Sequence, residues 1–313
     1  MTIARSVLGD IPTNALGVTY MHEHLIIDSR IVENEFKHIW LPSTEAAASE
    51  ASLCYEVGVR TIVDCMPMGS GGDIRKLVEV SKNSEINIIA STGMHTRKYY
   101  ESDDAILQMN ADELSEKFIE DIQIGSQNTS HKAGIIKVAS MDEKLSTKEK
   151  DLFEAAAIAH NQTGAPILTH CEHGEGAIEQ IELFHKLGIS LDNVTISHTD
   201  KVDDYGYHYE ILSSGVFVEF DQSLRQFEDL TPKSASLTCA LLEAGFSDQI
   251  MFGTDGARRT LWSTLNGTPG LAWLYSGWSK VLINLGVTQK DLDKFFIGNP
   301  SKALQFKEIK NVF

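Results

Sequence analysis

Residues 17–25 of the sequence, GVTYMHEHL, decide which fold this chain is expected to adopt. The stretch predicts a short strand that ends in two histidines, His22 and His24. Alternate side chains of a strand share a face, so both imidazoles would point the same way, at a spacing that suits one bound ion. The chain has eleven histidines, and two hydrogen-bonded histidines near a strand end are the structural alternative. Metal-binding side chains at the ends of later strands would favour the ion.

Strand-like and helix-like segments alternate along the rest of the chain. Short apolar runs rich in β-branched residues are typical of parallel strands that are buried on both faces. Segments with helical periodicity separate them. The predicted strands are 17–25, 60–65, 86–92, 134–139, 166–170, 193–198, 216–220 and 249–255. The predicted helices are 44–57, 73–83, 112–124, 147–162, 176–187, 203–213, 234–244, 271–285 and 289–297.

This alternation predicts an α/β protein, a single (β/α)8 TIM barrel domain over residues 1–313. A short N-terminal β-hairpin, residues 3–16 with its turn at 9–12, is expected before the first barrel strand. An open doubly wound sheet would also alternate, but its phosphate fingerprint G-x-G-x-x-G does not follow the first strand. The run GSGG at 69–72 is more simply a flexible loop than a phosphate cradle.

Composition and charge limit the partners of the protein. Hydrophobic residues make up 42% and charged residues 23%, as in soluble globular proteins. The formal net charge of -17 argues against nucleic acid or an anionic membrane as the main partner. The sequence shows neither a signal peptide nor a membrane span, and its four cysteines are expected to be buried free thiols. We therefore expect a cytoplasmic protein.

Metal-competent side chains recur where the predicted strands end. In a TIM barrel the active site lies at the C-terminal ends of the strands, so these side chains should meet at one mouth. Core histidines directly after apolar strands are uncommon. The candidates are His22 and His24 on the first strand, Lys137 on the fourth, His170 on the fifth, His198 on the sixth and Asp255 on the eighth.

Lys137 is the candidate that is hardest to explain as structural. It lies inside GIIKVA, where an ammonium group would be strongly unfavourable unless it is neutralised or paired. Carbamylation by carbon dioxide would convert it to an anion whose two oxygens could bridge two metal ions. The alternative is an ion pair with a carboxylate at the barrel mouth.

Asp255 lies in FGTDGARR, at the end of the last predicted strand. A carboxylate there could bind one metal ion and accept a proton, which places it for general acid and base catalysis. The structural alternative is an N-cap for the following segment.

At this point the sequence resembles the amidohydrolase superfamily and, within it, the phosphotriesterase family, which opens with G-x-T-x-x-H-E-H at the first strand. The resemblance extends over nearly the whole chain, through CMPMGSGGD, ASTGM, GIIKVAS, APILTH, SHTDKVDDY and FGTD. It implies that His22, His24 and Asp255 hold the more buried metal ion. His170 and His198 would hold the more exposed one, and carboxylated Lys137 would bridge both.

The resemblance also implies a chemistry. The two divalent ions would usually be zinc, with manganese, cobalt or nickel as substitutes, and would supply hydroxide near neutral pH. The hydroxide would attack a carbonyl or phosphoryl centre while Asp255 takes the proton. The sequence has no G-x-S-x-G nucleophile motif. Homodimers are common in the family.

Substrate choice is expected to depend on the loops, which are basic for so acidic a protein. Such loops would attract a small anionic substrate, and arginine suits a phosphate group. The segment DGARRTLWSTLNGTPGLAWL resembles the sugar-lactone branch of the family more than the organophosphate triesterases. We therefore expect a lactonase for a phosphorylated sugar lactone. Arg258 and Arg259, with Lys233 or Arg225, would grip the phosphate, and Tyr99 or Tyr100 would contact the lactone ring.

Other functions remain open at this stage. Within the same family the alternatives are a phosphotriesterase, a neutral (acyl-homoserine) lactonase or an amide deacetylase. A non-catalytic metal-binding barrel is the alternative from a different class. The presence of Lys137 counts against it, because a barrel without activity has no need of that lysine.

Overall fold

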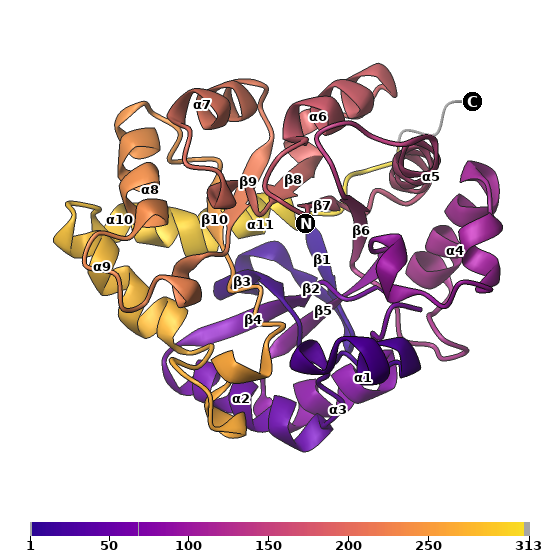
Figure 1. Ribbon diagram of the computed structural model, residues 1–313, viewed down its shortest axis with the longest axis horizontal. Coiled ribbons are helices and arrows are strands. Elements are labelled where there is room, and N and C mark those ends of the chain that lie inside the picture. Colours follow the sequence, from indigo (N-terminus) through magenta and orange to yellow (C-terminus); the bar gives the residue numbers. More distant parts are fainter. Residues whose placement is uncertain (1, 68, 310–313) are drawn as a thin grey trace.

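Eight parallel strands form a nearly closed barrel, in the order in which they occur in the sequence (Figure 1). The structure is a computed structural model that describes residues 2–67 and 69–309. The strands are β3 (Val18–Glu23), β4 (Val59–Asp64), β5 (Asn87–Gly93), β6 (Ile135–Ser140), β7 (Ile167–Cys171), β8 (Val194–Ser197), β9 (Phe217–Phe220) and β10 (Ile250–Phe252). The predicted TIM barrel is thus confirmed.

The barrel closes where the last strand meets the first. The chain leaves β10 at Phe252, and the backbone N–H groups of Thr254 and Asp255 then donate to the carbonyl of His22, at 3.1 and 3.0 Å. Between Tyr20 and Glu23 the pairing of β3 with β4 shifts register. Closure therefore places the turn at residues 253–256 (GTDG) against β3, which carries His22 and ends just before His24.

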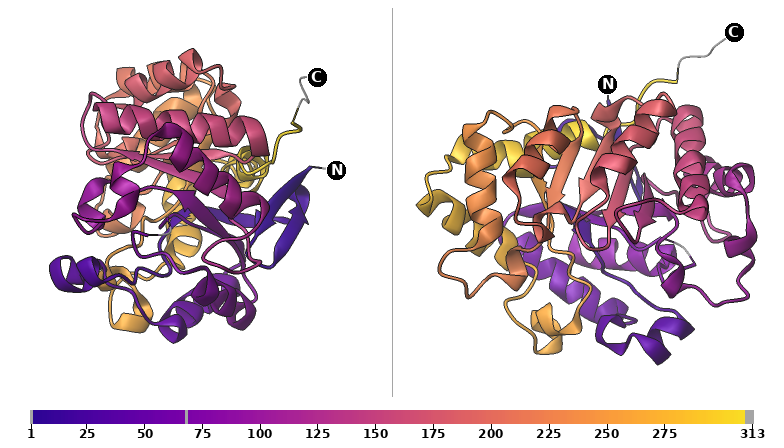
Figure 2. Two further views of the ribbon diagram at one scale, coloured as in Figure 1. Left: turned by 90° about the vertical axis from the view of Figure 1, so that its right-hand side faces the viewer. Right: turned by 45° about the horizontal axis from the view of Figure 1, so that its top comes forward.

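Helices surround the barrel, as Figure 2 shows from two further directions. Side-chain caps define several of them; α5, for example, begins with a capping box between Ser146 and Glu149. The helices are α1 (Arg30–Glu35), α2 (Thr44–Glu56), α3 (Ile74–Ser84), α4 (Ala111–Gln123), α5 (Thr147–Thr163), α6 (Ala177–Lys186), α7 (Tyr205–Ser213), α8 (Lys233–Glu243), α9 (Ser279–Asn284), α10 (Gln289–Asp293) and α11 (Asn299–Ala303). The predicted helix 271–285 begins with a π-helical turn, Leu274–Trp278, before α9.

The predicted N-terminal hairpin is present, but its predicted turn is wrong. Gly9–Pro12 is strand β2, which pairs antiparallel with β1 (Ile3–Ser6), and Ser6 lies opposite Gly9. The Ser6 hydroxyl stabilises a tighter turn by donating to the Gly9 carbonyl at 2.9 Å. The hairpin lies at the end of the barrel opposite α1, so it closes the end away from the candidate site (Figure 2).

Two apolar clusters fill the molecule. The smaller includes Met21, Val63, Leu168 and Met251, and the larger contains most of the apolar side chains that strands and helices contribute. All four cysteines are free thiols, and only Cys239 is partly exposed, so the expectation of buried thiols holds for three of them. None of the helices over residues 2–67 and 69–309 is long and apolar enough to cross a membrane.

Candidate metal centre and active site

The six side chains predicted from strand ends come together at one mouth of the barrel. Nζ of Lys137 lies 3.1 Å from Nε2 of His22, and Nδ1 of His170 lies 2.7 Å from Nε2 of His198. The His22 ring lies 4.5 Å from the His198 ring and 5.3 Å from the His24 ring. Asp255 completes the group, because its Oδ1 lies 3.3 Å from Nε2 of His24.

Lys137 has no exposed surface. It lies in β6, all of whose residues are buried, and its amine faces the His22 imidazole rather than solvent. Burial lowers the pKa of Lys137. The ammonium form of Lys137 is therefore less favourable here than in water.

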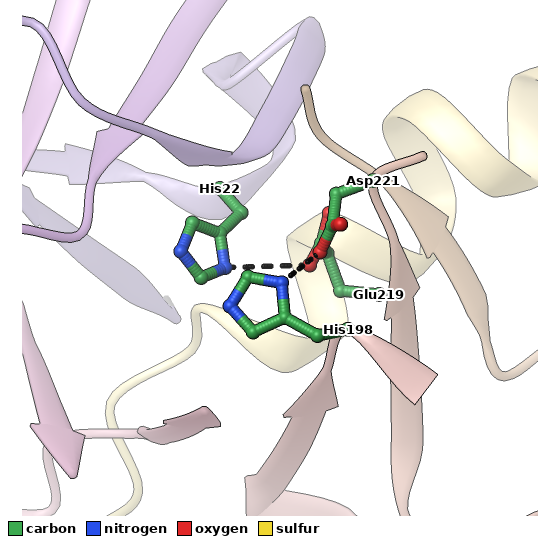
Figure 3. Close-up of side chains that lie close together, drawn as sticks. All are labelled: His22, His198, Glu219 and Asp221. Carbon is green, nitrogen blue, oxygen red and sulfur yellow. Dashed lines mark hydrogen bonds and ion pairs between the residues drawn. The ribbon is translucent and has the colours of Figure 1, made fainter. Parts of the chain in front are cut away.

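Two buried acidic side chains, from β9 and the turn after it, lie against two of the histidines (Figure 3). Asp221 accepts a hydrogen bond from Nδ1 of His198, and Oε2 of Glu219 lies 3.4 Å from Nδ1 of His22. Burial would raise the pKa of Asp221, but His198 outweighs it and lowers this pKa to about 2. The remaining nitrogen of each imidazole, Nε2, consequently points into the centre of the group.

The sequence interpretation missed Glu219 and Asp221, although the signal was present. Both are acidic residues in or directly after the apolar run VFVEF, and both are fully buried. Like Lys137, each is an ionisable group in or next to a buried strand and therefore needs a partner. Their place in the sequence was thus sufficient to predict that they take part in the site.

The donor set fits divalent transition metals. The ligand atoms of His22, His24 and Asp255 lie within 4.8 Å of one another, and the same holds for a second group of His22, His198, Glu219 and Asp221. Imidazole nitrogen with carboxylate oxygen is the donor combination that zinc and its neighbours in the first transition row prefer. His170 joins the group through the nitrogen that faces His198.

Replacing Asp221 with asparagine is expected to weaken zinc binding by roughly 10- to 100-fold, the usual effect of removing a carboxylate that orients a ligand histidine. Competition with a chromophoric chelator measures this affinity. Asp248→Asn is the control, because Asp248 pairs with Lys294 and Lys302 near the surface. An Asp221→Asn protein with unchanged zinc affinity would show that His198 needs no such partner.

Asp255 is held in position by an arginine. Burial would raise the pKa of Asp255, but Arg225, whose Nη2 lies 2.8 Å from Oδ2, and His24 together hold it well below its usual range. Arg225 also donates to the backbone carbonyls of Thr254 and Asp255, each at 2.9 Å. The carboxylate is therefore ionised at neutral pH and able to accept a proton.

A cavity of about 460 Å³ opens beside these residues, and His24, His170 and Asp255 lie in its wall. Phe36 and Ile39 contribute apolar surface. His95, which the sequence interpretation left out of the site, also lines the cavity, is buried, and packs edge-on against His170 with ring centres 4.6 Å apart. Its position in a loop gave no periodic signal that could have predicted this.

The predicted substrate-binding residues divide into two sets. Arg225, Arg258 and Tyr99 line the cavity. The other three lie elsewhere. Tyr100 is buried and its hydroxyl accepts from the His95 N–H, Arg259 donates to the Trp40 carbonyl at 2.8 Å, and Lys233 pairs with Asp203 at the surface at 3.0 Å.

Two lysines reach the cavity on the side of His170. Nζ of Lys98 lies 2.5 Å from Oε1 of Glu172, and Nζ of Lys201 donates to the Glu172 carbonyl at 3.0 Å. The other carboxylate oxygen of Glu172 lies 2.8 Å from Nε2 of His170. Glu172 thus orients the His170 ring and holds the ammonium groups of Lys98 and Lys201 beside it. Lys201 follows His198 by three residues, a proximity that the sequence interpretation did not use.

Comparison with known proteins agrees with this geometry. A model of the phosphotriesterase family matches residues 3–304. An aryldialkylphosphatase from Saccharolobus solfataricus is 31% identical, over 93% of this chain and 96% of its own. A phospho-furanose lactonase from Mycoplasmopsis synoviae is 30% identical, over 98% and 93%. The crystal structure of a lactonase from Listeria monocytogenes superposes with a TM-score of 0.93 at 26% identity, covering 98% of this chain and 100% of that one.

The family match spans nearly the whole chain, and these relatives are hydrolases. The histidine and aspartate cluster supplies the metal-binding group that such hydrolysis requires. The chain therefore belongs to the phosphotriesterase family and is a metal-dependent hydrolase.

Proposed function

We propose that the protein opens a phosphorylated sugar lactone by hydrolysis, with two divalent cations bound at the barrel mouth. His22, His24 and Asp255 would hold one cation, and His170 and His198 the other. The convergence of their nitrogen and oxygen atoms supports this assignment. When bound, the cations would polarise the reacting carbonyl and lower the pKa of water to near neutrality.

Lys137 is proposed to join the two cation sites as a carboxylated lysine. Its neutral amine would attack carbon dioxide, forming an N–C bond and releasing one proton to solvent. The product is an anion with two oxygens. Its lowered pKa makes loss of the proton easier than for an exposed lysine, and its Nζ lies 3.1 Å from Nε2 of His22, within reach of the ligand group.

Asp255 is proposed as the proton acceptor of the reaction. It is ionised because Arg225 and His24 hold its pKa low, and it lines the cavity in which a substrate would lie. A carboxylate in that place could take a proton from attacking water and deliver it to the leaving oxygen of the lactone. No serine or cysteine nucleophile is required.

The substrate assignment rests on the positively charged side chains that line the cavity. Lys98, Lys201, Arg225 and Arg258 line it, although the chain as a whole has a net charge of -17. Lys98 and Arg225 are already paired with Glu172 and Asp255. Arg258 is exposed, and no ion pair involves it within the described part of the chain, so its guanidinium is available to a phosphate.

The relatives agree in part with this proposal. A phospho-furanose lactonase and an aryldialkylphosphatase match with similar identity, so the comparison supports lactone and phosphotriester hydrolysis alike. The polar, cationic cavity favours the phosphorylated lactone, because a neutral triester would offer the exposed Arg258 guanidinium no charged partner.

A panel of substrates tests the proposal: sugar lactones with and without a phosphate, an acyl-homoserine lactone, an aryl phosphotriester and an N-acetyl sugar. We expect turnover to be highest for the phosphorylated lactones, lost on chelation and restored by zinc with bicarbonate. Equal rates on phosphorylated and plain lactones would contradict the role of the cations. Preference for the triester or the amide would identify one of the alternative activities.

Removing positively charged side chains from the cavity should affect phosphorylated and plain lactones differently. Lys98→Gln and Arg258→Gln are each expected to raise KM for a phosphorylated lactone by roughly 10-fold, the value of one charged hydrogen bond of about 1.4 kcal/mol, with plain lactones little affected. Lys233→Gln is the control. The sequence predicts that Lys233 binds the phosphate, whereas the structure places it at the surface in an ion pair with Asp203. A rise in its KM would mean that Lys233 reaches the substrate after all.

A further inference from the structure

One buried carboxylate binds the residue that precedes Asp255. Glu23, the last residue of β3, lies between His22 and His24 and has no exposed surface, and its Oε1 accepts from the backbone N–H of Thr254 at 2.8 Å. Its Oε2 accepts from the Thr254 hydroxyl. A carboxylate that accepts two hydrogen bonds from one residue fixes both the backbone and the side chain of that residue.

Asp255 has a backbone conformation that needs such support. Its φ is +42°, in the left-handed region that residues other than glycine rarely adopt. Its neighbours are confined as well. A Cβ on Gly253 would lie 2.6 Å from the backbone nitrogen of His22, and one on Gly256 would lie 3.2 Å from Oε2 of Glu23. The GTDG turn is thus pressed against β3 at both ends.

We infer that Glu23 is a positioning residue for Asp255, an inference that rests on the function proposed for this site. By holding Thr254, Glu23 keeps Asp255 in the left-handed conformation in which Oδ1 faces His24 and Oδ2 faces Arg225. Because Glu23 lies between His22 and His24 in the sequence, it fixes three proposed ligands as one unit. Glu23 itself binds neither cation nor substrate.

Glu23→Gln tests this inference, because glutamine keeps the shape but replaces one accepting oxygen with a donor. We expect kcat to fall by roughly 10- to 100-fold through misplacement of Asp255, with KM within about twofold. Zinc affinity, measured on the same protein by chelator competition, should fall as well. Thr254→Val, which removes only the donated hydroxyl, should change both quantities in the same direction, and Thr254→Ser, which keeps it, should not.

Glu50→Gln is the matched control. Glu50 in α2 is equally buried and accepts the backbone N–H groups of Thr264 and Leu271, both at 2.9 Å, so its loss should lower Tm without loosening Asp255. The inference is wrong if Glu23→Gln lowers Tm as much as Glu50→Gln does but keeps the kcat and zinc affinity of the wild-type protein. If the wild-type protein hydrolyses none of the lactones, zinc affinity still decides: weaker binding in Glu23→Gln and Thr254→Val supports the positioning role, and equal binding overturns it.

Discussion

Replacing Lys137 with methionine is expected to lower kcat by roughly 10³-fold or more, since the loss of about 4 kcal/mol of transition-state stabilisation corresponds to that factor. Methionine fills much of the same space and carries no charge. Because Lys137 is fully buried in β6, removing an amine there should leave the unfolding temperature equal or higher. An inactive protein that remains stably folded would separate the catalytic role of the lysine from a structural one.

The measurements for this variant are kcat, Tm and bound zinc per chain. Zinc content should fall below that of the wild-type protein, because the proposed bridging ligand is missing. Lys150→Ala on α5 serves as the control, since Lys150 is half exposed and pairs with Glu179. Lys137→Met with wild-type turnover and full zinc content would contradict the bridging role.

Replacing Asp255 with asparagine is expected to lower kcat by roughly 10²- to 10⁴-fold, the range over which general acid–base catalysis contributes. Asparagine preserves the shape but cannot accept a proton at neutral pH. It also removes the charge partner of Arg225, which lies 2.8 Å from the carboxylate. The freed guanidinium should bind anions more tightly, so KM for a phosphorylated lactone should not rise.

Steady-state kinetics against pH measure this effect. In the wild-type protein the pKa of Asp255 is held low, so activity should not fall at neutral pH through its protonation. Asp192→Asn, in an ion pair with Lys307 at the surface, should behave as wild type. An Asp255→Asn protein whose kcat falls less than about tenfold would assign the proton transfer to another group.

The fold could be predicted from the sequence because each barrel strand is a short apolar run, and buried parallel strands require such runs on both faces. β6 is the clearest case, with all of its residues buried. The hairpin turn was predicted wrongly because Gly-Asp and Pro usually mark turns, whereas here Gly9 pairs with Ser6 and the turn precedes it.

The ligand group could be predicted for a geometric reason, because the C-terminal ends of barrel strands lie together irrespective of the conformation of the loops. Loop side chains offer no such constraint. Arg258 and Arg259 are neighbours in the sequence, yet Arg258 lines the cavity and Arg259 binds the Trp40 carbonyl. His95 reaches the cavity from a loop whose conformation the sequence does not reveal.

A crystal structure grown with zinc and bicarbonate, with anomalous scattering recorded at the zinc edge, would determine whether two cations and a carboxylated lysine occupy the barrel mouth. The proposal predicts two anomalous peaks, one beside His22, His24 and Asp255 and one beside His170 and His198, with density for a carboxylate on Nζ of Lys137 between them. A single peak, or none, next to an unmodified Lys137 amine would contradict it.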